Sequence, residues 1–170
     1  MGESLKGKCA IVTGAGRGIG AAIALAFARE GANVALAART IEQLHAVRDQ
    51  IVALGRRALV IPTDMGVPAQ VEALVQQSIA GLGAVDIVVS NAASPGPMAP
   101  LTAVSADTWR EIQSVNLDGP LTLLKAIAPH MLQRGSGSVI MISSIRGTNG
   151  VPYGVAYAAS KAALNSITRT

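Results

Sequence analysis

Short apolar runs alternate with longer amphipathic stretches along the chain. The runs are nearly continuous in apolar residues, which is typical of strands buried on both faces of a parallel sheet. They occupy residues 9–14, 33–38, 58–64, 85–91 and 138–143. The stretches between them, such as 41–54 and 70–82, have the apolar spacing of helices. The alternation predicts an α/β fold in which a doubly wound parallel sheet forms a single domain over residues 1–170.

One amphipathic stretch is longer than the others. Residues 105–132 predict a single long helix that Ser105 or Asp107 caps at its start. Pro120 falls inside it; proline has no N–H and crowds the carbonyl group four residues earlier, which belongs to Asn116. We therefore expect a kink here and a free Asn116 carbonyl group that can hold a water molecule. A kink that serves only packing is the alternative.

Composition narrows the functional classes. The net charge is +4, but the longest basic run is Arg56-Arg57 and only 2% of the residues are aromatic, so we expect no nucleic-acid partner. A single cysteine, Cys9, excludes an internal disulfide bond and suits a reducing compartment, which favours a cytoplasmic location. No apolar run reaches the roughly 18 residues of a membrane span. No group of His, Cys, Asp or Glu residues has the spacing of metal ligands.

A glycine-rich turn, TGAGRGIG at 13–20, follows the first apolar run and opens a helical pattern. Backbone N–H groups at the start of a helix bind phosphate groups when no side chain blocks them. The spacing is T-G-x-x-x-G-x-G, because Ile19 stands where G-x-G-x-x-G needs its last glycine, and no G-K-[ST] sequence marks a Walker-type loop. A tight turn without a ligand is the alternative. The candidate cofactor-binding residues of the turn are Gly14, Gly16, Arg17, Gly18, Ile19 and Gly20.

The end of the second apolar run bears on which dinucleotide fits. A carboxylate there would bind a free ribose 2′-hydroxyl group, whereas an arginine accommodates a 2′-phosphate. The run ends at Ala38 and Arg39 without a carboxylate, and Arg17 offers a second positive charge. NADP is therefore favoured over NAD, although both arginines are also compatible with an ordinary surface. Asp64, at the end of the third run, is a candidate acceptor for the adenine amino group or an ordinary turn residue.

The sequence YAASK places Tyr157 and Lys161 four residues apart, so that both lie on one face of a helix. An ammonium group about 4 Å from the phenol, at an effective dielectric constant of about 20, favours the phenolate by about 4 kcal/mol before desolvation opposes it. Such a tyrosine suits general acid–base catalysis. Taken alone, the spacing also fits an ordinary surface pair. Tyr153 has no lysine four residues further on and is expected to shape the substrate side instead.

Together these motifs resemble the short-chain dehydrogenase/reductase family over essentially the whole chain. The resemblance is carried, in chain order, by TGAGRGIG at 13–20, TDM at 63–65, SNAA at 90–93, SVNLDG at 114–119, MISSIRG at 141–147 and YAASK at 157–161. It implies a Rossmann-type fold, a nicotinamide cofactor and a carbonyl or alcohol substrate. The catalytic set that it implies is Asn116, Ser144, Tyr157 and Lys161. It also implies cofactor contacts from Asp64, Met65, Asn91, Ala92, Tyr157 and Lys161.

Ser144 follows the fifth apolar run, and its hydroxyl group can donate a hydrogen bond to the substrate oxygen. Ser143 is adjacent, but the family's spacing to the tyrosine favours Ser144. The resemblance also implies a proton relay from bulk water, through a water molecule at the Asn116 carbonyl group, to Lys161 and Tyr157.

Two features depart from the family pattern. Ala93 stands where the family's N-N-A-G sequence has its glycine, and family members continue the helix begun at Tyr157 and add further strands and a substrate lid. We therefore expect a sheet that lacks the C-terminal strands, and a homo-oligomer in a full-length form. Arg146, two residues beyond Ser144, is a candidate contact for an acidic substrate or an ordinary surface residue.

Three functions stay open. The first is an NADP-dependent oxidoreductase that interconverts a carbonyl group and an alcohol on a small-molecule substrate, with Tyr157 as general acid and base. A truncated NADP-binding module without turnover shares every site residue with it. A basic binder of nucleic acid is the third. The sequence identifies neither the substrate nor the direction of the reaction.

Overall fold

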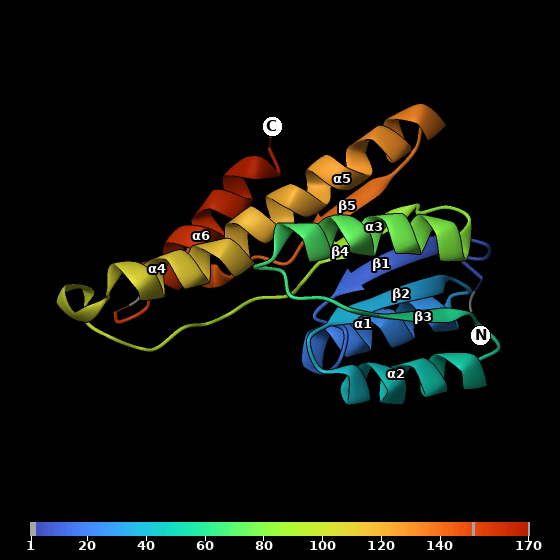
Figure 1. Cartoon of the computed structure of the whole chain (residues 1–170), viewed down its shortest axis with the longest axis horizontal. Coiled ribbons are helices and arrows are strands. Elements are labelled where there is room, and N and C mark those ends of the chain that lie inside the picture. The colour runs from blue at the N-terminus through green and yellow to red at the C-terminus, as the bar shows by residue number, and fades with distance from the viewer. Residues whose placement is uncertain (1–2, 151, 170) are drawn as a thin grey trace.

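A parallel sheet forms the centre of the computed structural model, which describes residues 3–150 and 152–169 (Figure 1). Its strands are β1 (Cys9–Thr13), β2 (Asn33–Ala38), β3 (Ala58–Pro62), β4 (Ile87–Ser90) and β5 (Ser138–Met141). They lie in the order β3-β2-β1-β4-β5, and each neighbouring pair is parallel. The chain changes direction across the sheet between β3 and β4, so the predicted doubly wound parallel sheet is confirmed.

Helices cover both faces of the sheet because its inner strands are apolar on both. α3 (Pro68–Leu82) and α5 (Gly119–Arg134) lie on one face, and α1 (Gly18–Arg29) and α2 (Ile41–Ala53) lie on the other (Figure 1). β1 shows the division, since Ile11 belongs to the same buried cluster as Leu123 of α5, and Val12 belongs to the cluster of Leu44 in α2. Within the described ranges, no helix combines the length and apolar character needed to cross a membrane.

The predicted long helix over 105–132 is confirmed in outline, because the chain is helical without a break from Ala106 to Arg134. α4 (Ala106–Gln113) begins at one of the predicted caps, where Ser105 Oγ accepts a hydrogen bond from Thr108 N at 3.0 Å. A π-helical segment, Ser114–Asp118, then joins α4 to α5. Pro120 lies two residues beyond this segment and has no N–H for the helical bond to the Asn116 carbonyl group, which is the physical reason for the local change in helical form.

The strands end earlier than the apolar runs predict. β3 ends at Pro62, β4 at Ser90 and β5 at Met141, whereas the runs continue to residues 64, 91 and 143. The last residues of these runs leave the sheet at its carboxyl edge. α6 (Val155–Ile167) packs against α4 and against the short 3₁₀ turn Ile145–Gly147 that follows β5.

Candidate active site

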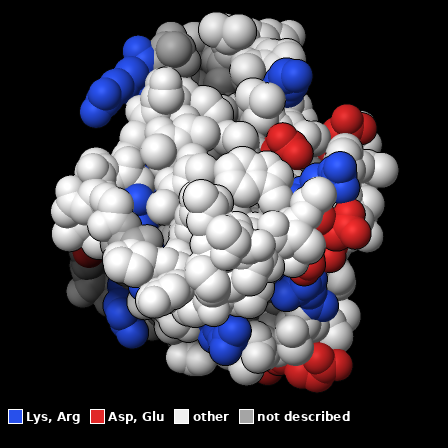
Figure 2. All heavy atoms as spheres, turned by 90° about the vertical axis from the view of Figure 1, so that its left-hand side faces the viewer, with Lys and Arg blue, Asp and Glu red and all other residues white. Residues whose placement is uncertain are grey.

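A cavity of about 710 Å³ opens at the carboxyl edge of the sheet. Residues that follow each strand line it, together with residues of α6. Figure 2 views the molecule from the side toward which β1 points in Figure 1, and charged side chains there surround a mostly uncharged centre. The cavity brings together these predicted residues: Gly14, Gly16, Arg17, Gly18, Ile19, Arg39, Asp64, Met65, Asn91, Ala92, Tyr157 and Lys161.

The glycine-rich turn leads from β1 into α1 and has no room for side chains at two positions. A Cβ atom on Gly14 would lie 2.7 Å from Asn91 Nδ2, and a Cβ atom on Gly20 would collide with the Gly14 carbonyl oxygen. α1 begins at Gly18, which lines the cavity, so the N–H groups of its first turn lack helical partners at this place. The turn therefore fits the phosphate groups of a dinucleotide.

Thr13 lies at the start of the turn and hydrogen-bonds to the segment that follows β4. Sequence reasoning did not single it out as a site residue. Its Oγ1 accepts hydrogen bonds from Asn91 N at 2.9 Å and Ala92 N at 3.0 Å, and the partners lie 78 and 79 residues away in the chain. Asn91 Nδ2 in turn donates to Thr13 O at 2.9 Å. Thr13 and Asn91 thus join the ends of β1 and β4. A hydroxyl group at the end of an otherwise apolar run was the available signal.

Arg17 and Arg39 line the part of the cavity that adjoins the end of β2. A Cβ atom on Gly16 would lie 3.0 Å from Gln43 Oε1 and 3.7 Å from Ala38 Cβ, so the glycine-rich turn packs beside this strand end. In the described part of the chain, none of the ion pairs involves either arginine. Both guanidinium groups are therefore available to a phosphate group. Gln43 also lines the cavity and was not predicted, although it lies in the first turn of the helix after Arg39.

Asp64 lines the cavity and also closes a turn. Its Oδ1 accepts a hydrogen bond from Gly66 N at 2.9 Å, and its own N–H donates to Gln70 Oε1 at 2.7 Å. Asp64 thus acts as a turn residue, which was one of its two predicted roles. Its second carboxylate oxygen can still accept a hydrogen bond from another donor. Met65 is buried beside it and lines the cavity as well.

Tyr157 and Lys161 both face the cavity from α6. Lys161 is only 3% exposed, and its Nζ donates a hydrogen bond to the Ile142 carbonyl oxygen at 2.7 Å. The Nζ atom lies over the Tyr157 ring, 5.6 Å from its centre. Burial lowers the pKa of Lys161, because the apolar surroundings disfavour its charged form. The predicted pairing on one helical face is present, with the ammonium group over the ring face.

The two adjacent serines after β5 have different positions. Ser143 lines the cavity, and its Oγ donates a hydrogen bond to the Lys161 carbonyl oxygen at 3.0 Å. Ser144, the predicted catalytic serine, is not among the lining residues; its Oγ accepts from Arg146 N at 3.2 Å and caps the 3₁₀ turn. An acceptor hydroxyl keeps its own proton, so Ser144 can still donate it. Its catalytic role stays a prediction.

Asn116 is fully buried and connects the segment after β4 with α6. Its Oδ1 accepts from Ser94 N at 2.7 Å, while its Nδ2 donates to Ser94 O at 2.9 Å and to Ser160 Oγ at 3.1 Å. Ser160 Oγ then donates to the Tyr157 carbonyl oxygen at 2.7 Å. The sequence argument concerned only the main-chain carbonyl of Asn116, and it missed this side-chain role. The water relay through that carbonyl stays a prediction.

Comparisons with known proteins agree with this geometry. The family model described as short chain dehydrogenase matches residues 8–170. An uncharacterized oxidoreductase of Mycobacterium tuberculosis is 42% identical over 166 residues, which cover 97% of this chain. The chain spans 63% of that relative's own length.

Solved structures give the same picture. A metagenomic short-chain oxidoreductase in complex with NADP is 41% identical and has a TM-score of 0.93, over 98% of this chain and 75% of the other. An NAD+-bound xylitol dehydrogenase is 30% identical and has a TM-score of 0.94, over 97% of this chain and 64% of the other. Proteins similar to this chain thus bind either dinucleotide.

Proposed function

Because the chain belongs to the short chain dehydrogenase family, we propose that it is an NADP-dependent oxidoreductase that interconverts a carbonyl group and an alcohol on a small molecule. One observation carries the proposal: the glycine-rich turn and the Tyr157–Lys161 pair line the same cavity. A phosphate-binding turn and an acid–base group are the two parts that such a reaction needs from the protein.

In this proposal each site residue has a definite task. A bound nicotinamide cofactor would supply or accept the hydride. Tyr157 donates its phenolic proton to the carbonyl oxygen in reduction and removes the alcohol proton in oxidation. Lys161, held over the ring, stabilises the negative charge left on the phenol and reaches toward the ribose hydroxyls. Ser144 donates a hydrogen bond to the substrate oxygen, and Asn116 holds the water that returns the proton.

The preference for NADP rests on Arg17 and Arg39. Both line the cavity beside the end of β2, and that strand end offers no carboxylate to a ribose 2′-hydroxyl. A fluorescence titration with NADPH and, separately, NADH tests this. We expect NADPH to bind at least about tenfold more tightly, because a charge-assisted hydrogen bond contributes about 1.5–3 kcal/mol. Equal affinities would overturn the preference.

Two arginine variants sharpen the titration. Arg39→Asp should remove the preference for NADPH, since a carboxylate repels the 2′-phosphate and accepts from a 2′-hydroxyl. Arg48→Asp changes charge by the same amount on α2, where Arg48 pairs with Asp49 and does not line the cavity. It should leave both affinities unchanged.

Turnover is measured on the same samples by following NADPH consumption with generic ketones. We expect a rate that Tyr157→Phe abolishes while NADPH binding persists. Saturable NADPH binding without any turnover would overturn the catalytic part and leave a binding module. The cytoplasmic location and the homo-oligomeric full-length form stay predictions.

A further inference from the structure

Arg146 lies beside the candidate active site and has no anionic partner among the described residues. Its side chain is half-buried on the turn Ile145–Gly147, and Nη1 lies 3.6 Å from the sulfur atom of Met98, a weak acceptor. Across residues 3–150 and 152–169, none of the ion pairs includes Arg146. The contact with Met98 is exposed, so water reaches the guanidinium group and no ion pair within the described chain occupies its N–H groups.

Arg146 does not itself line the cavity, but its turn packs against α6, the helix of Tyr157, and directly follows Ser144. Arg146 N donates to Ser144 Oγ at 3.2 Å, so the arginine is fixed two residues from that serine. Its Nη1 lies 3.2 Å from the place that a Cβ atom on Gly154 would occupy. Gly154 is the N-cap of α6, three residues before Tyr157, which is less than one helical turn. A glycine at this position therefore leaves room for the guanidinium group at the start of the helix that carries Tyr157.

The neighbours of Arg146 come from two segments that hold each other in place. Ala99 N donates to Tyr153 O at 3.0 Å and joins the segment after β4 to the segment before α6. Met98 and Tyr153 are both largely exposed there and offer apolar surface without negative charge. The acidic residues that line the cavity, Asp64 and Glu111, form no ion pair with Arg146. The positive charge thus stays available to a ligand.

We propose that Arg146 binds a carboxylate group of the substrate, so that the protein acts on oxo acids and hydroxy acids in preference to neutral ketones and alcohols. The inference rests on the proposed function, because it assigns the substrate class of the same site. A guanidinium group presents a planar fork of N–H donors that matches both oxygens of a carboxylate. Because Ser144 and Arg146 belong to the same short turn, one small molecule can present its carbonyl group to Ser144 and its carboxylate to Arg146.

Equilibrium binding tests the proposal without requiring turnover. Isothermal titration of the whole chain, with and without saturating NADP, measures pyruvate and levulinate against their methyl esters, which keep the ketone and lose the charge. We expect at least one acid to bind about tenfold more tightly than its ester or better. Arg146→Met keeps the apolar stem and should remove this difference without weakening the ester. Arg146→Lys keeps the charge but not the fork and should retain part of it.

A matched control removes the same charge elsewhere. Arg110 is exposed on α4 and pairs with Asp107, so Arg110→Met should leave every acid-to-ester ratio unchanged. Equal binding of acids and esters by the original chain, or equal ratios in the original chain and Arg146→Met, would overturn the proposal. A titration with NADPH on each sample keeps the two hypotheses apart. Acid binding that depends on Arg146 without NADPH binding would support the carboxylate site and overturn the proposed function; NADPH binding with no charge preference would do the reverse.

Discussion

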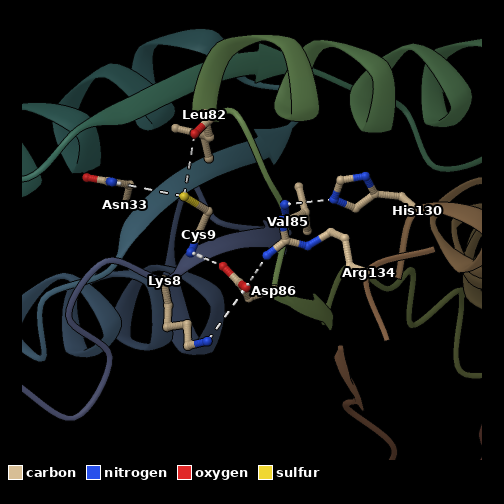
Figure 3. A network of polar contacts seen from close by, with 8 residues as sticks. All are labelled: Lys8, Cys9, Asn33, Leu82, Val85, Asp86, His130 and Arg134. Atoms are coloured by element: carbon tan, nitrogen blue, oxygen red, sulfur yellow. Dashed lines mark hydrogen bonds and ion pairs between the residues drawn. The ribbon is translucent and has the colours of Figure 1, made fainter. Parts of the chain in front are cut away.

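Strands β1 and β4 are joined by side-chain hydrogen bonds at both the amino and the carboxyl edge of the sheet. The two edges differ in how many nearby polar groups remain without a partner inside the protein. At the amino edge, Asp86 Oδ2 accepts from Cys9 N at 2.9 Å, while its Oδ1 pairs with Arg134 at 3.1 Å and Lys8 at 3.7 Å (Figure 3). At the carboxyl edge, Thr13 accepts from the two residues that follow β4. At each edge, one oxygen-bearing side chain thus connects the same two strands by hydrogen bonds.

The surroundings of Asp86 and of Thr13 differ in a way that indicates where a ligand can bind. Near Asp86, other polar groups also find partners inside the protein, since His130 Nε2 accepts from Val85 N at 3.2 Å and Cys9 Sγ donates to Leu82 O at 3.7 Å (Figure 3). In the cavity at the carboxyl edge, by contrast, the guanidinium groups of Arg17 and Arg39 form none of the ion pairs found in the described ranges. A saturated cluster stabilises the fold, whereas an unsaturated one can bind a ligand.

Removing the Asp86 carboxylate at the amino edge should lower the stability of the protein without changing its cofactor binding. We expect this to be the largest of the changes in stability. Asp86→Ala leaves Cys9 N without an acceptor and Arg134 without its partner, so we expect the free energy of unfolding to fall by about 2–3 kcal/mol. NADPH affinity should not change. Urea denaturation and the fluorescence titration measure the two quantities. Asp107→Ala, which removes an exposed acid on α4, should cost no more than about 0.5 kcal/mol. Weaker NADPH binding by Asp86→Ala would show that the two edges are coupled.

Removing the Thr13 hydroxyl group at the carboxyl edge should lower both the stability of the protein and its affinity for NADPH. Thr13→Val keeps the shape but leaves Asn91 N and Ala92 N without their acceptor, so unfolding should become easier by about 1–2 kcal/mol. The glycine-rich turn loses its support, and NADPH binding should weaken in the same variant. Thr13→Ser retains the hydroxyl group and should restore most of both. If Thr13→Ser behaves like Thr13→Val, the hydrogen bonds are not the cause.

The buried ammonium group of Lys161 should cost stability at neutral pH. Its pKa is lowered by burial, so the folded state binds this proton less strongly than the unfolded state. Stability of the original chain should therefore rise as the pH increases toward the ordinary value of 10.5. Lys161→Met, which lacks the charge, should be no less stable at pH 7 and up to about 1 kcal/mol more stable. That advantage should shrink at higher pH.

Urea midpoints at neutral and alkaline pH measure this change. Lys125→Met removes the same charge from the exposed side of α5; it is the matched control and should not gain stability at pH 7. A clear loss of stability in Lys161→Met at pH 7 would mean that the bond to the Ile142 carbonyl outweighs the cost of burial.

The thiol of Cys9 should give the smallest change in stability. Its dependence on pH should be opposite in sign to that of Lys161. Burial raises the pKa of Cys9 above its usual 9.0, so the folded state keeps this proton longer than the unfolded state does. Its contribution to stability is therefore lost as the pH rises above about 9. Between pH 8 and pH 10, Cys9→Ala should lose a few tenths of a kcal/mol less than the original chain. Identical pH profiles of the urea midpoint would contradict this, and rapid labelling of the native thiol by a disulfide reagent would contradict its burial.

Local sequence was sufficient for much of the fold. The five apolar runs identified the five strands, because a strand buried on both faces must be apolar at nearly every position. The glycine-rich turn and the Tyr157–Lys161 spacing were equally visible, because a turn and one helical face involve only neighbouring residues. The strand ends were less predictable, since Thr63, Asn91 and Ser143 continue apolar runs and yet leave the sheet to line the cavity.

The partners of the polar groups depended on the tertiary structure. Thr13 and Asn91 are 78 residues apart, and Lys161 bonds to a carbonyl group 19 residues earlier rather than to any neighbour on its helix. Asn116 likewise reaches Ser160 only because its π-helical segment packs against α6, and it reaches Ser94 across 22 residues of chain. The sequence by itself therefore determined the elements and the chemical groups available at the carboxyl edge. Which of those groups are bonded within the protein and which stay available was decided by the tertiary structure, because a hydrogen bond depends on distance in space and not on separation along the chain.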